Sequence, residues 1–219
     1  MQYLSTLSES NGTKIPSLIE LSQILGVSVA SLREQMEVAR IMGLIEVKPR
    51  TGIQKVPYSF SKSVLINLTY ALVNDPSSFD AYSDLRKHIE SAYWKEAVSL
   101  LNAEDVDGLF TIINVAFNKL HAKPPQIPHE EHKRFHLSMY KKLNNIFVTG
   151  ILEAYWQEYE DVGLDVYTDL QYLEQVWMYH QKTVEAIARG ELDSGYKSFA
   201  EHMEMISKRS TKPRISRFE

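Results

Sequence analysis

Cysteine is absent from the 219 residues, and so is any long uninterrupted run of apolar side chains. Without cysteine, disulfides, thiolate metal sites and cysteine nucleophiles are excluded, and the chain suits the reducing cytosol. The most apolar segment, residues 64–73, contains Asn67 and Thr69 and is far shorter than the roughly 20 residues that span a bilayer. Residues 1–11 hold no cationic side chain, unlike a signal peptide. We therefore expect a cytoplasmic protein with no membrane partner.

An excess of basic charge is also missing. Lys and Arg together number 24 against 28 Asp and Glu, so the formal net charge is −4, which by itself disfavours a nucleic-acid partner. The charge is unevenly distributed, because residues 1–60 carry six basic and five acidic side chains and the remainder carries 18 and 23. With 44% hydrophobic and 24% charged residues, the composition is that of a globular protein. We interpret the asymmetry as two domains with different partners.

The front of the chain predicts two short helices joined by a tight turn. Ser17 and Glu20 have the spacing of a capping box, in which each side chain satisfies the other residue's backbone amide, and Gly26 ends the helix that begins there. Ser28 offers a second N-cap, and apolar residues then recur at helical spacing up to Gly43. This arrangement is a helix-turn-helix.

A small hairpin is expected next. Residues 44–48 alternate in polarity like a strand, residues 49–52 contain the Pro and Gly of a turn, and residues 53–56 can return as the partner strand. The segment 1–58 is therefore predicted to be a winged helix-turn-helix domain.

The rest of the chain, residues 59–219, predicts an all-helical antiparallel bundle, so the fold class is mainly α. Residues 57–61 are expected to form a linker, because Pro57 and small polar residues interrupt both periodicities. Trp94, Trp156 and Trp177 are expected in the core or at a subunit interface. We place helices at 62–74, 78–101, 104–121, 129–143, 146–161, 166–189 and 192–208, followed by a basic tail.

Several side chains of the front domain are candidates for contacting DNA. The second helix of a helix-turn-helix enters the major groove, and hydroxyls near helix starts hold phosphates. Arg33 is the natural base reader because its planar fork matches guanine O6 and N7; the alternative is a surface arginine paired with Glu37. Arg50 on the wing can reach the backbone or the minor groove. The candidate DNA contacts are Ser17, Ser28, Val29, Ser31, Arg33, Arg50 and Gly52.

Four histidines of the helical half suggest a metal site. His132 and His136 are four residues apart, so both lie on one face of a helix, while His180 and His202 lie on later helices. Imidazole nitrogens suit zinc, nickel, copper or iron, and helical bundles commonly hold such ions in their core. The alternative is that each histidine is an ordinary hydrogen-bonded core residue.

The order of these motifs resembles the GntR family of bacterial transcription regulators, in the subgroup whose C-terminal half is the all-helical FCD domain. The resemblance covers nearly the whole chain. In the front half it rests on residues 14–21, Leu25 to Ser28, Leu32 to Glu34, Gly43 to Ile45 and Gly52. In the back half it rests on Phe135, His136, Asn145, His180, Ala186, Ile187, Gly190 and His202, with Arg86 and Glu90 on an earlier helix.

The resemblance implies a homodimeric regulator that binds a pseudo-palindromic double-stranded DNA operator. It also implies that a small organic acid, bound in the helical domain through a divalent metal, alters the DNA affinity. Arg86 is then a candidate to neutralise the carboxylate effector, and Asn145 is a second effector-binding candidate. His132, His136, His180 and His202 would be the metal ligands.

Two departures from the family pattern affect these expectations. The family usually has an aspartate where this chain has His132, and a four-histidine set favours nitrogen-loving metals, zinc or nickel, over calcium or magnesium. Glu131 or His129 could take the place of that aspartate instead. At the DNA end, Ile19 and Val29 stand where arginines are common in the family, which weakens DNA binding or changes its target. The first helix is also shortened.

Two other readings remain open from the sequence. One is a metal-dependent enzyme built on a histidine-lined bundle, but Glu130, Glu131 and Glu201 are candidate general bases only by proximity in the sequence. The other keeps the regulator fold and makes the metal itself the signal. The sequence favours a regulator that is not an enzyme, because a small metalloenzyme has no need of the front domain.

Overall fold

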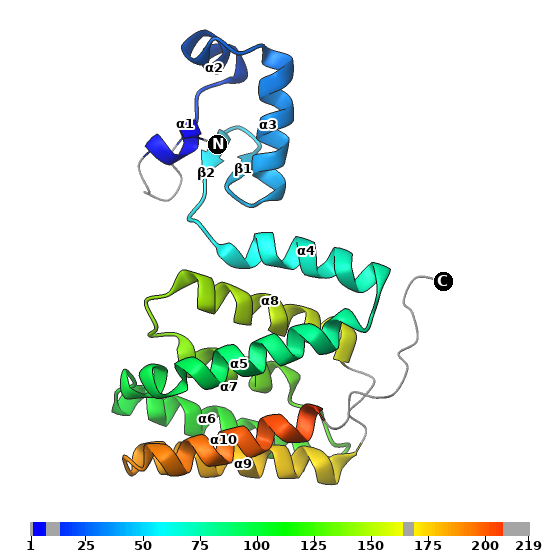
Figure 1. The fold of residues 1–219 in the computed structure, drawn as a ribbon, viewed down its shortest axis with the longest axis vertical. Helices are drawn as coiled ribbons and strands as arrows, with labels where there is room; N and C mark the ends of the chain where they lie inside the picture. The colour runs from blue at the N-terminus through cyan, green and yellow to red at the C-terminus, as the bar shows by residue number, and fades with distance from the viewer. Residues whose placement is uncertain (1, 8–13, 164–168, 208–219) are drawn as a thin grey trace. The chain divides into compact units, whose positions relative to one another are not determined.

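The computed structural model describes residues 2–7, 14–163 and 169–207, and these form two compact units, residues 1–63 and 64–219. Each unit has its own hydrophobic core. The described chain is mostly helical with one small antiparallel sheet (Figure 1). The predicted fold class, a winged helix-turn-helix followed by a helical bundle, is confirmed.

The first unit is built around two helices and a hairpin. Its elements are α1 (Gln2–Thr6), α2 (Leu18–Leu25), α3 (Val29–Ile41), β1 (Ile45–Lys48) and β2 (Gly52–Lys55). The capping box forms as expected, because the Ser17 side chain accepts from the Glu20 amide and the Glu20 carboxylate accepts from the Ser17 amide. Gly26 ends α2 in the left-handed region. Apolar side chains of all these elements, among them Leu4, Leu21, Leu32 and Ile45, form the core.

The hairpin gives the unit its wing. The two strands pair antiparallel with Ile45 opposite Lys55 and Lys48 opposite Gly52. The turn between them places Arg50 (φ 70°) and Gly52 (φ 80°) in the left-handed region, which L side chains other than Asn and Asp rarely adopt. The wing tip is therefore a tightly turned segment with the Arg50 side chain exposed.

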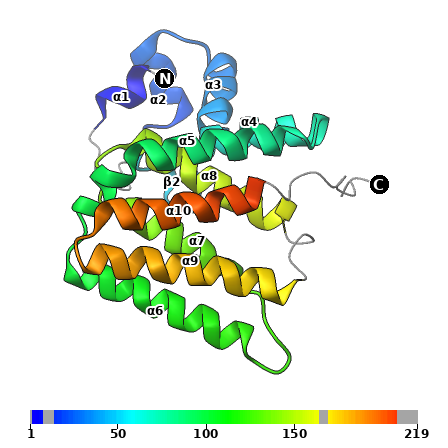
Figure 2. The ribbon, with the colours of Figure 1, turned by 60° about the horizontal axis from the view of Figure 1, so that its bottom comes forward.

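The second unit is a bundle in which α7 is the central helix. It contacts α5, α6 and α8, while α9 lies between α6 and α10 (Figures 1 and 2). Half of the residues of α7 are buried, including two histidines and one glutamate. The helices of this part are α4 (Phe60–Asn74), α5 (Ser78–Ser99), α6 (Ala103–Leu120), α7 (His129–Tyr140), α8 (Ile146–Gly163), α9 (Leu170–Ala188) and α10 (Leu192–Ser207).

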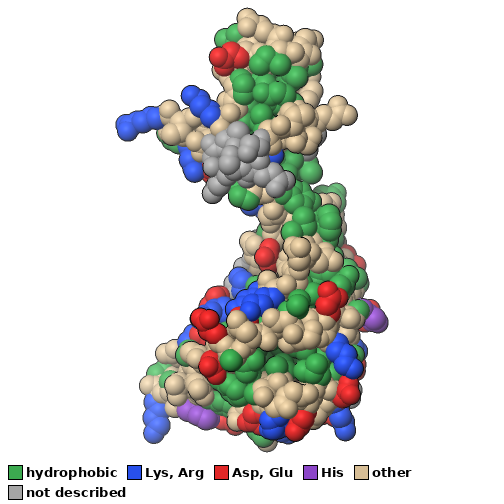
Figure 3. Space-filling view, turned by 90° about the vertical axis from the view of Figure 1, so that its left-hand side faces the viewer, with side chains coloured by type: hydrophobic (Ala, Val, Ile, Leu, Met, Phe, Trp, Pro, Cys, Tyr) green, Lys and Arg blue, Asp and Glu red, His purple; other side chains and the backbone are tan. Residues whose placement is uncertain are grey.

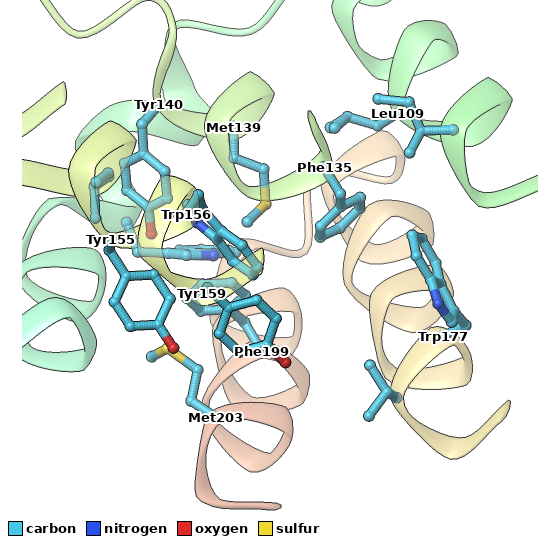
Figure 4. Packing of buried hydrophobic residues seen from close by; sticks show 14 of the residues in the cluster. Leu109, Phe135, Met139, Tyr140, Tyr155, Trp156, Tyr159, Trp177, Phe199 and Met203 are labelled. Carbon is cyan, nitrogen blue, oxygen red and sulfur yellow. The ribbon is translucent and has the colours of Figure 1, made fainter. Parts of the chain in front are cut away.

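Large aromatic side chains fill the bundle core, as the sequence suggested. Trp94, Trp156 and Trp177 are each about 1% exposed or less. Figure 4 shows Tyr155, Trp156 and Tyr159 of α8 together in this core, with the ring centroids of Trp156 and Tyr159 5.0 Å apart. At Gly195 of α10 a Cβ atom would lie 3.1 Å from the Trp94 ring, so the absence of a side chain there lets α10 pack closely against α5.

The observed boundaries differ from the expected ones in detail. The linker is shorter than residues 57–61, because α4 already begins at Phe60. Helix α7 ends at Tyr140 rather than at 143, and α1 is only five residues long. Residues 8–13, residues 166–168 of the expected 166–189 helix, and the basic tail from Lys208 lie outside the described residues. None of the described helices is long and apolar enough to cross a membrane.

Candidate functional site

Three helices bring four histidines together in the middle of the bundle. His132 and His136 lie on α7, His180 on α9 and His202 on α10. All four are buried, and His136, His180 and His202 have no exposed surface. One ring nitrogen from each residue lies within 4.8 Å of the others. The four residues singled out by spacing therefore form a single cluster.

Local sequence explains this convergence. The separation of four residues stacks His132 and His136 on one face of α7, and their ring centroids are 5.0 Å apart. Gly190, with φ 74°, lies in the short turn between α9 and α10. His180 precedes this glycine by ten residues and His202 follows it by twelve, so the two antiparallel helices place them opposite each other. Their ring centroids are 4.2 Å apart.

The environment keeps the four imidazoles neutral. Burial lowers the pKa of each of them well below the usual value for histidine, and nearby Arg86 lowers it further, while Glu90 opposes this shift at His202. Burial acts this way because it disfavours the protonated, charged form. A neutral imidazole is the form that binds a metal ion.

The hydrogen-bonding state of the cluster fits a metal better than a set of ordinary core histidines. His132 Nε2 and both ring nitrogens of His180 and His202 are buried without a hydrogen-bond partner. Buried polar atoms almost always have one. Zinc or nickel would use such nitrogens, with ligand distances of about 2.0–2.1 Å for zinc, so a modest contraction of the cluster would be needed. The donor set, four nitrogens and no oxygen, suits these metals rather than calcium or magnesium.

A buried ion pair lies against one side of the cluster. Arg86 and Glu90 on α5 are 3% and 0% exposed, with Nε and Oε2 2.8 Å apart. Glu90 Oε1 and Arg86 Nη2 each lie 3.0 Å from Nδ1 of His136. This nitrogen can donate to Glu90 or accept from Arg86 according to the tautomer, but it cannot do both. A carboxylate that accepts from Nδ1–H leaves the lone pair of Nε2 for a metal, and Arg86 Nη2, 3.4 Å from Nε2, would have to give way to that ion.

Aromatic rings hold the guanidinium in place. The Arg86 Cζ atom lies 4.6 Å from the centre of the Tyr155 ring and 4.5 Å from that of Trp156. Burial lowers the pKa of Arg86, but the negative charge of Glu90 and the hydrogen bonds of the guanidinium to Glu90 and Tyr155 together raise the pKa above the usual value. Burial raises the pKa of Glu90, against the lowering effect of Arg86. Sequence reasoning did not identify Tyr155 and Trp156 as neighbours of Arg86, because nothing in their spacing separates them from other core aromatics.

Other candidates from the sequence are placed outside the cluster. The Glu131 carboxylate lies 2.7 Å from Lys119 Nζ, so it is already engaged with a cation on α6. Asn145 caps α8, because its amide oxygen accepts from the backbone amides of Phe147 and Val148. Its side-chain nitrogen lies 3.5 Å from the Tyr93 hydroxyl. Contact of Asn145 with an effector stays a prediction.

The first unit presents its candidate residues around the start of α3 and on the wing. Ser28 caps α3 through its hydroxyl, which accepts from the Ser31 amide. Arg33 is exposed. Glu37 pairs with Arg40, at 2.9 Å from Arg40 Nε, rather than with Arg33. Val29 lies in the first turn of α3 and Gly52 at the start of β2.

Comparison with known proteins agrees with this architecture. A model of the FCD domain matches residues 82–205, the part that holds Arg86 and all four histidines. The chain is 24% identical over 202 residues to the Uxu operon regulator of Haemophilus influenzae, covering 90% of this chain and 73% of that protein. It is 21% identical over 203 residues to the Uxu operon transcriptional regulator of Escherichia coli, covering 90% and 78%.

Solved structures share the fold at low sequence identity. Streptococcus agalactiae GntR superposes with a TM-score of 0.67 at 17% identity, covering 92% of this chain and 91% of that one. E. coli McbR/YncC superposes with a TM-score of 0.52 at 15% identity, covering 95% and 92%. Together with the family match, these findings show that the chain belongs to the GntR family of transcriptional regulators, as a member whose helical unit is an FCD domain.

Proposed function

We propose that this regulator binds a pseudo-palindromic operator as a homodimer in the cytoplasm, and that a small carboxylate bound at a metal in the FCD domain changes its DNA affinity. The observation that carries the effector part is the buried cluster of His132, His136, His180 and His202, in which five ring nitrogens of His132, His180 and His202 have no hydrogen-bond partner. A protein that only binds DNA has no need of such a cluster.

The four histidines would hold zinc or nickel, and the metal would supply a Lewis-acidic centre that a carboxylate can chelate. Glu90 would fix His136 with Nδ1 protonated, because its carboxylate lies 3.0 Å from that atom. Arg86 would add positive charge beside the metal, although its pairing with Glu90 balances part of that charge. Asn145 is a further candidate for contact with the effector.

The first unit would bind DNA in the manner of a winged helix-turn-helix. Arg33 is proposed to read a guanine from the first turns of α3, where its side chain is exposed. Ser17 and Ser28 use their oxygens as acceptors in the helix caps, which leaves the hydroxyl protons available to phosphates. Ser31, Val29, Arg50 and Gly52 complete the proposed surface.

A direct test measures operator affinity by fluorescence anisotropy, with the DNA upstream of the chain's own gene as the first probe. Arg33→Ala is expected to weaken binding by about 1–3 kcal/mol. Arg189→Ala, which removes an exposed arginine of the helical unit, is the matched control and should leave binding unchanged. Equal affinities for the Arg33 variant and the parent protein would contradict the proposal.

The metal is tested by elemental analysis of protein purified without chelator. We expect about one transition-metal ion per chain, lost in His136→Ala and retained in His121→Ala, since His121 is 62% exposed and outside the cluster. Absence of metal from the parent protein even after reconstitution would remove the chelation step from the proposal.

One observation favours a second candidate function, a regulator for which the metal alone is the signal. Four imidazole nitrogens complete a tetrahedral shell, and four-coordinate zinc then has no open position for a carboxylate. Metal-loaded and metal-free protein would in that case differ in operator affinity without any organic ligand. An enzyme is not favoured, because Glu90, whose carboxylate contacts His136, is paired with Arg86, and Glu131 is paired with Lys119.

A further inference from the structure

A narrow pocket of the helical unit leads from the surface to the edge of the histidine cluster. His132 forms part of its wall, and His129, in the first turn of α7, also lines it. The space that no atom fills amounts to ≈ 320 Å³, part of it open to solvent. The pocket has room for about one water molecule, so a larger ligand reaches the His132 side of the proposed metal site only when the walls part.

The walls of this pocket are apolar and aromatic. Leu173, Val176 and Trp177 come from α9 and Tyr159 from α8. Val176 and Trp177 are 2% and 1% exposed. The polar groups that the walls offer are two imidazoles, two phenols, an indole and backbone, and the lining residues include no carboxylate, amide, aliphatic hydroxyl, lysine or arginine.

Aromatic rings also surround the inner end of the pocket. The His132 ring centroid lies 4.8 Å from Trp156, 5.9 Å from Trp177 and 6.1 Å from Tyr159. Aromatic rings at these separations pack in offset or edge-to-face arrangements, and the flat ring of a ligand could pack against them in the same way. Figure 4 shows Trp177 on α9 across from the rings of α8. A flat apolar ligand that parts these side chains would keep ring contacts with them.

We infer that the effector is a carboxylate with an apolar body, such as an aromatic or branched alkyl carboxylic acid, rather than a polyhydroxylated sugar acid. The inference rests on the proposed function, since the carboxylate is taken to face the metal. Each hydroxyl of a sugar acid needs a hydrogen-bonding partner when it is buried, and the walls offer no carboxylate, amide, lysine or arginine side chain for it. The apolar body would lie against Val176 and Trp177, and the carboxylate would point towards His132.

The inference is tested by isothermal titration calorimetry on the full chain loaded with one equivalent of nickel. Nickel is used because it accepts more than four ligands. The probes are phenylacetate, 4-methylpentanoate, glucuronate and acetate. We expect phenylacetate or 4-methylpentanoate to bind at least tenfold more tightly than both glucuronate and acetate. Removal of the nickel should abolish the binding.

A pair of matched variants places the apolar body in the pocket. Val176→Thr puts a hydroxyl into the wall at nearly constant volume, and it should weaken binding of the apolar carboxylates about tenfold while leaving acetate unchanged. Val184→Thr is the control, because Val184 is fully buried on the same helix but is not a lining residue. Thermal melts of both variants establish that they fold.

The outcomes separate the two proposals. Nickel-dependent binding of glucuronate as tight as that of the apolar acids overturns the inference and leaves carboxylate sensing intact. Equal losses in Val176→Thr and Val184→Thr also overturn it. If none of the four acids binds the nickel-loaded protein, carboxylate sensing at this site fails, and the inference fails with it.

Discussion

At the scale of single residues, the histidine cluster makes stability depend on pH in a predictable direction. The pKa of each imidazole is lowered in the folded protein, chiefly by burial, whereas in the unfolded chain it is about 6.5. Below that pH the unfolded chain therefore binds more protons than the folded one, and stability falls as the pH falls.

We expect the metal-free protein to lose unfolding free energy as the pH is lowered from 7.5 to 5.5. The loss approaches about 1.4 kcal/mol per pH unit for each histidine that stays neutral in the fold. Urea denaturation at several pH values measures it, and His88→Ala, at an exposed position, should show the parental slope. A flat profile over this range would show that the buried imidazoles do not resist protonation.

The Arg86–Glu90 pair permits a second residue-scale prediction. Both side chains are buried, so Arg86→Met or Glu90→Leu alone leaves an uncompensated charge in the core and should destabilise the protein by about 3–5 kcal/mol. The double variant should lose much less than the sum of the two single losses. Chemical denaturation of the four proteins gives the coupling energy, and strictly additive losses would be the contrary result.

At the scale of elements, the start of α3 combines a cap with a proposed phosphate contact, and the two roles can be separated. Ser28→Asp preserves the cap, because aspartate is an equally good N-cap residue, but it places a negative charge against the DNA backbone. We expect unchanged thermal stability and at least tenfold weaker operator binding. Ser28→Ala should instead cost about 1 kcal/mol of stability. Undiminished DNA affinity of the aspartate variant would remove Ser28 from the interface.

The elements themselves were largely predictable from the sequence, because local signals mark their ends. The Ser17–Glu20 box, Gly26, Ser28 and Gly190 each lie at a helix end where expected. The capping box of Asn102 and Asp105 at the start of α6 went unrecognised, although its residue types have the right spacing. The C-terminal end of α7 was placed too late because no glycine or proline marks it.

The candidate site was only partly predictable. Helical spacing brings His132 next to His136, and the turn at Gly190 pairs His180 with His202, so the cluster could be expected once α7 was placed beside α9 and α10. The contacts of Arg86 with Tyr155 and Trp156 depend on how α5 and α8 pack. Such packing depends on the shapes of many side chains at once, which no local pattern encodes.

At the scale of the whole molecule, acidic side chains outnumber basic ones. Figure 3 shows acidic and basic side chains interspersed over the visible face of the helical unit, and the net charge of the chain is −4. Operator affinity should therefore come from local contacts of the first unit and from the presence of two such units in a dimer, rather than from a broad basic surface.

The proposed dimer leads to a prediction about the operator. Two recognition helices of a dimer bind half-sites about one helical turn apart. Insertion of five base pairs between the half-sites turns one of them to the opposite face of the DNA, and we expect affinity to fall to that of a single half-site. Insertion of ten base pairs returns the two half-sites to the same face of the DNA. Equal binding to the parent and five-base-pair operators would argue against two-site recognition.

The close packing at Gly195 has a consequence for how such a site can change over evolution. Gly195 and His202 are seven residues apart, so both lie on the same face of α10, two turns from each other. A Cβ atom at position 195 would lie 3.1 Å from the Trp94 ring, so either that ring or the helix that carries His202 would have to shift by a few tenths of an ångström. The spacing of the four histidines, and with it the preference of the proposed metal site, can therefore drift through substitutions that leave every histidine in place.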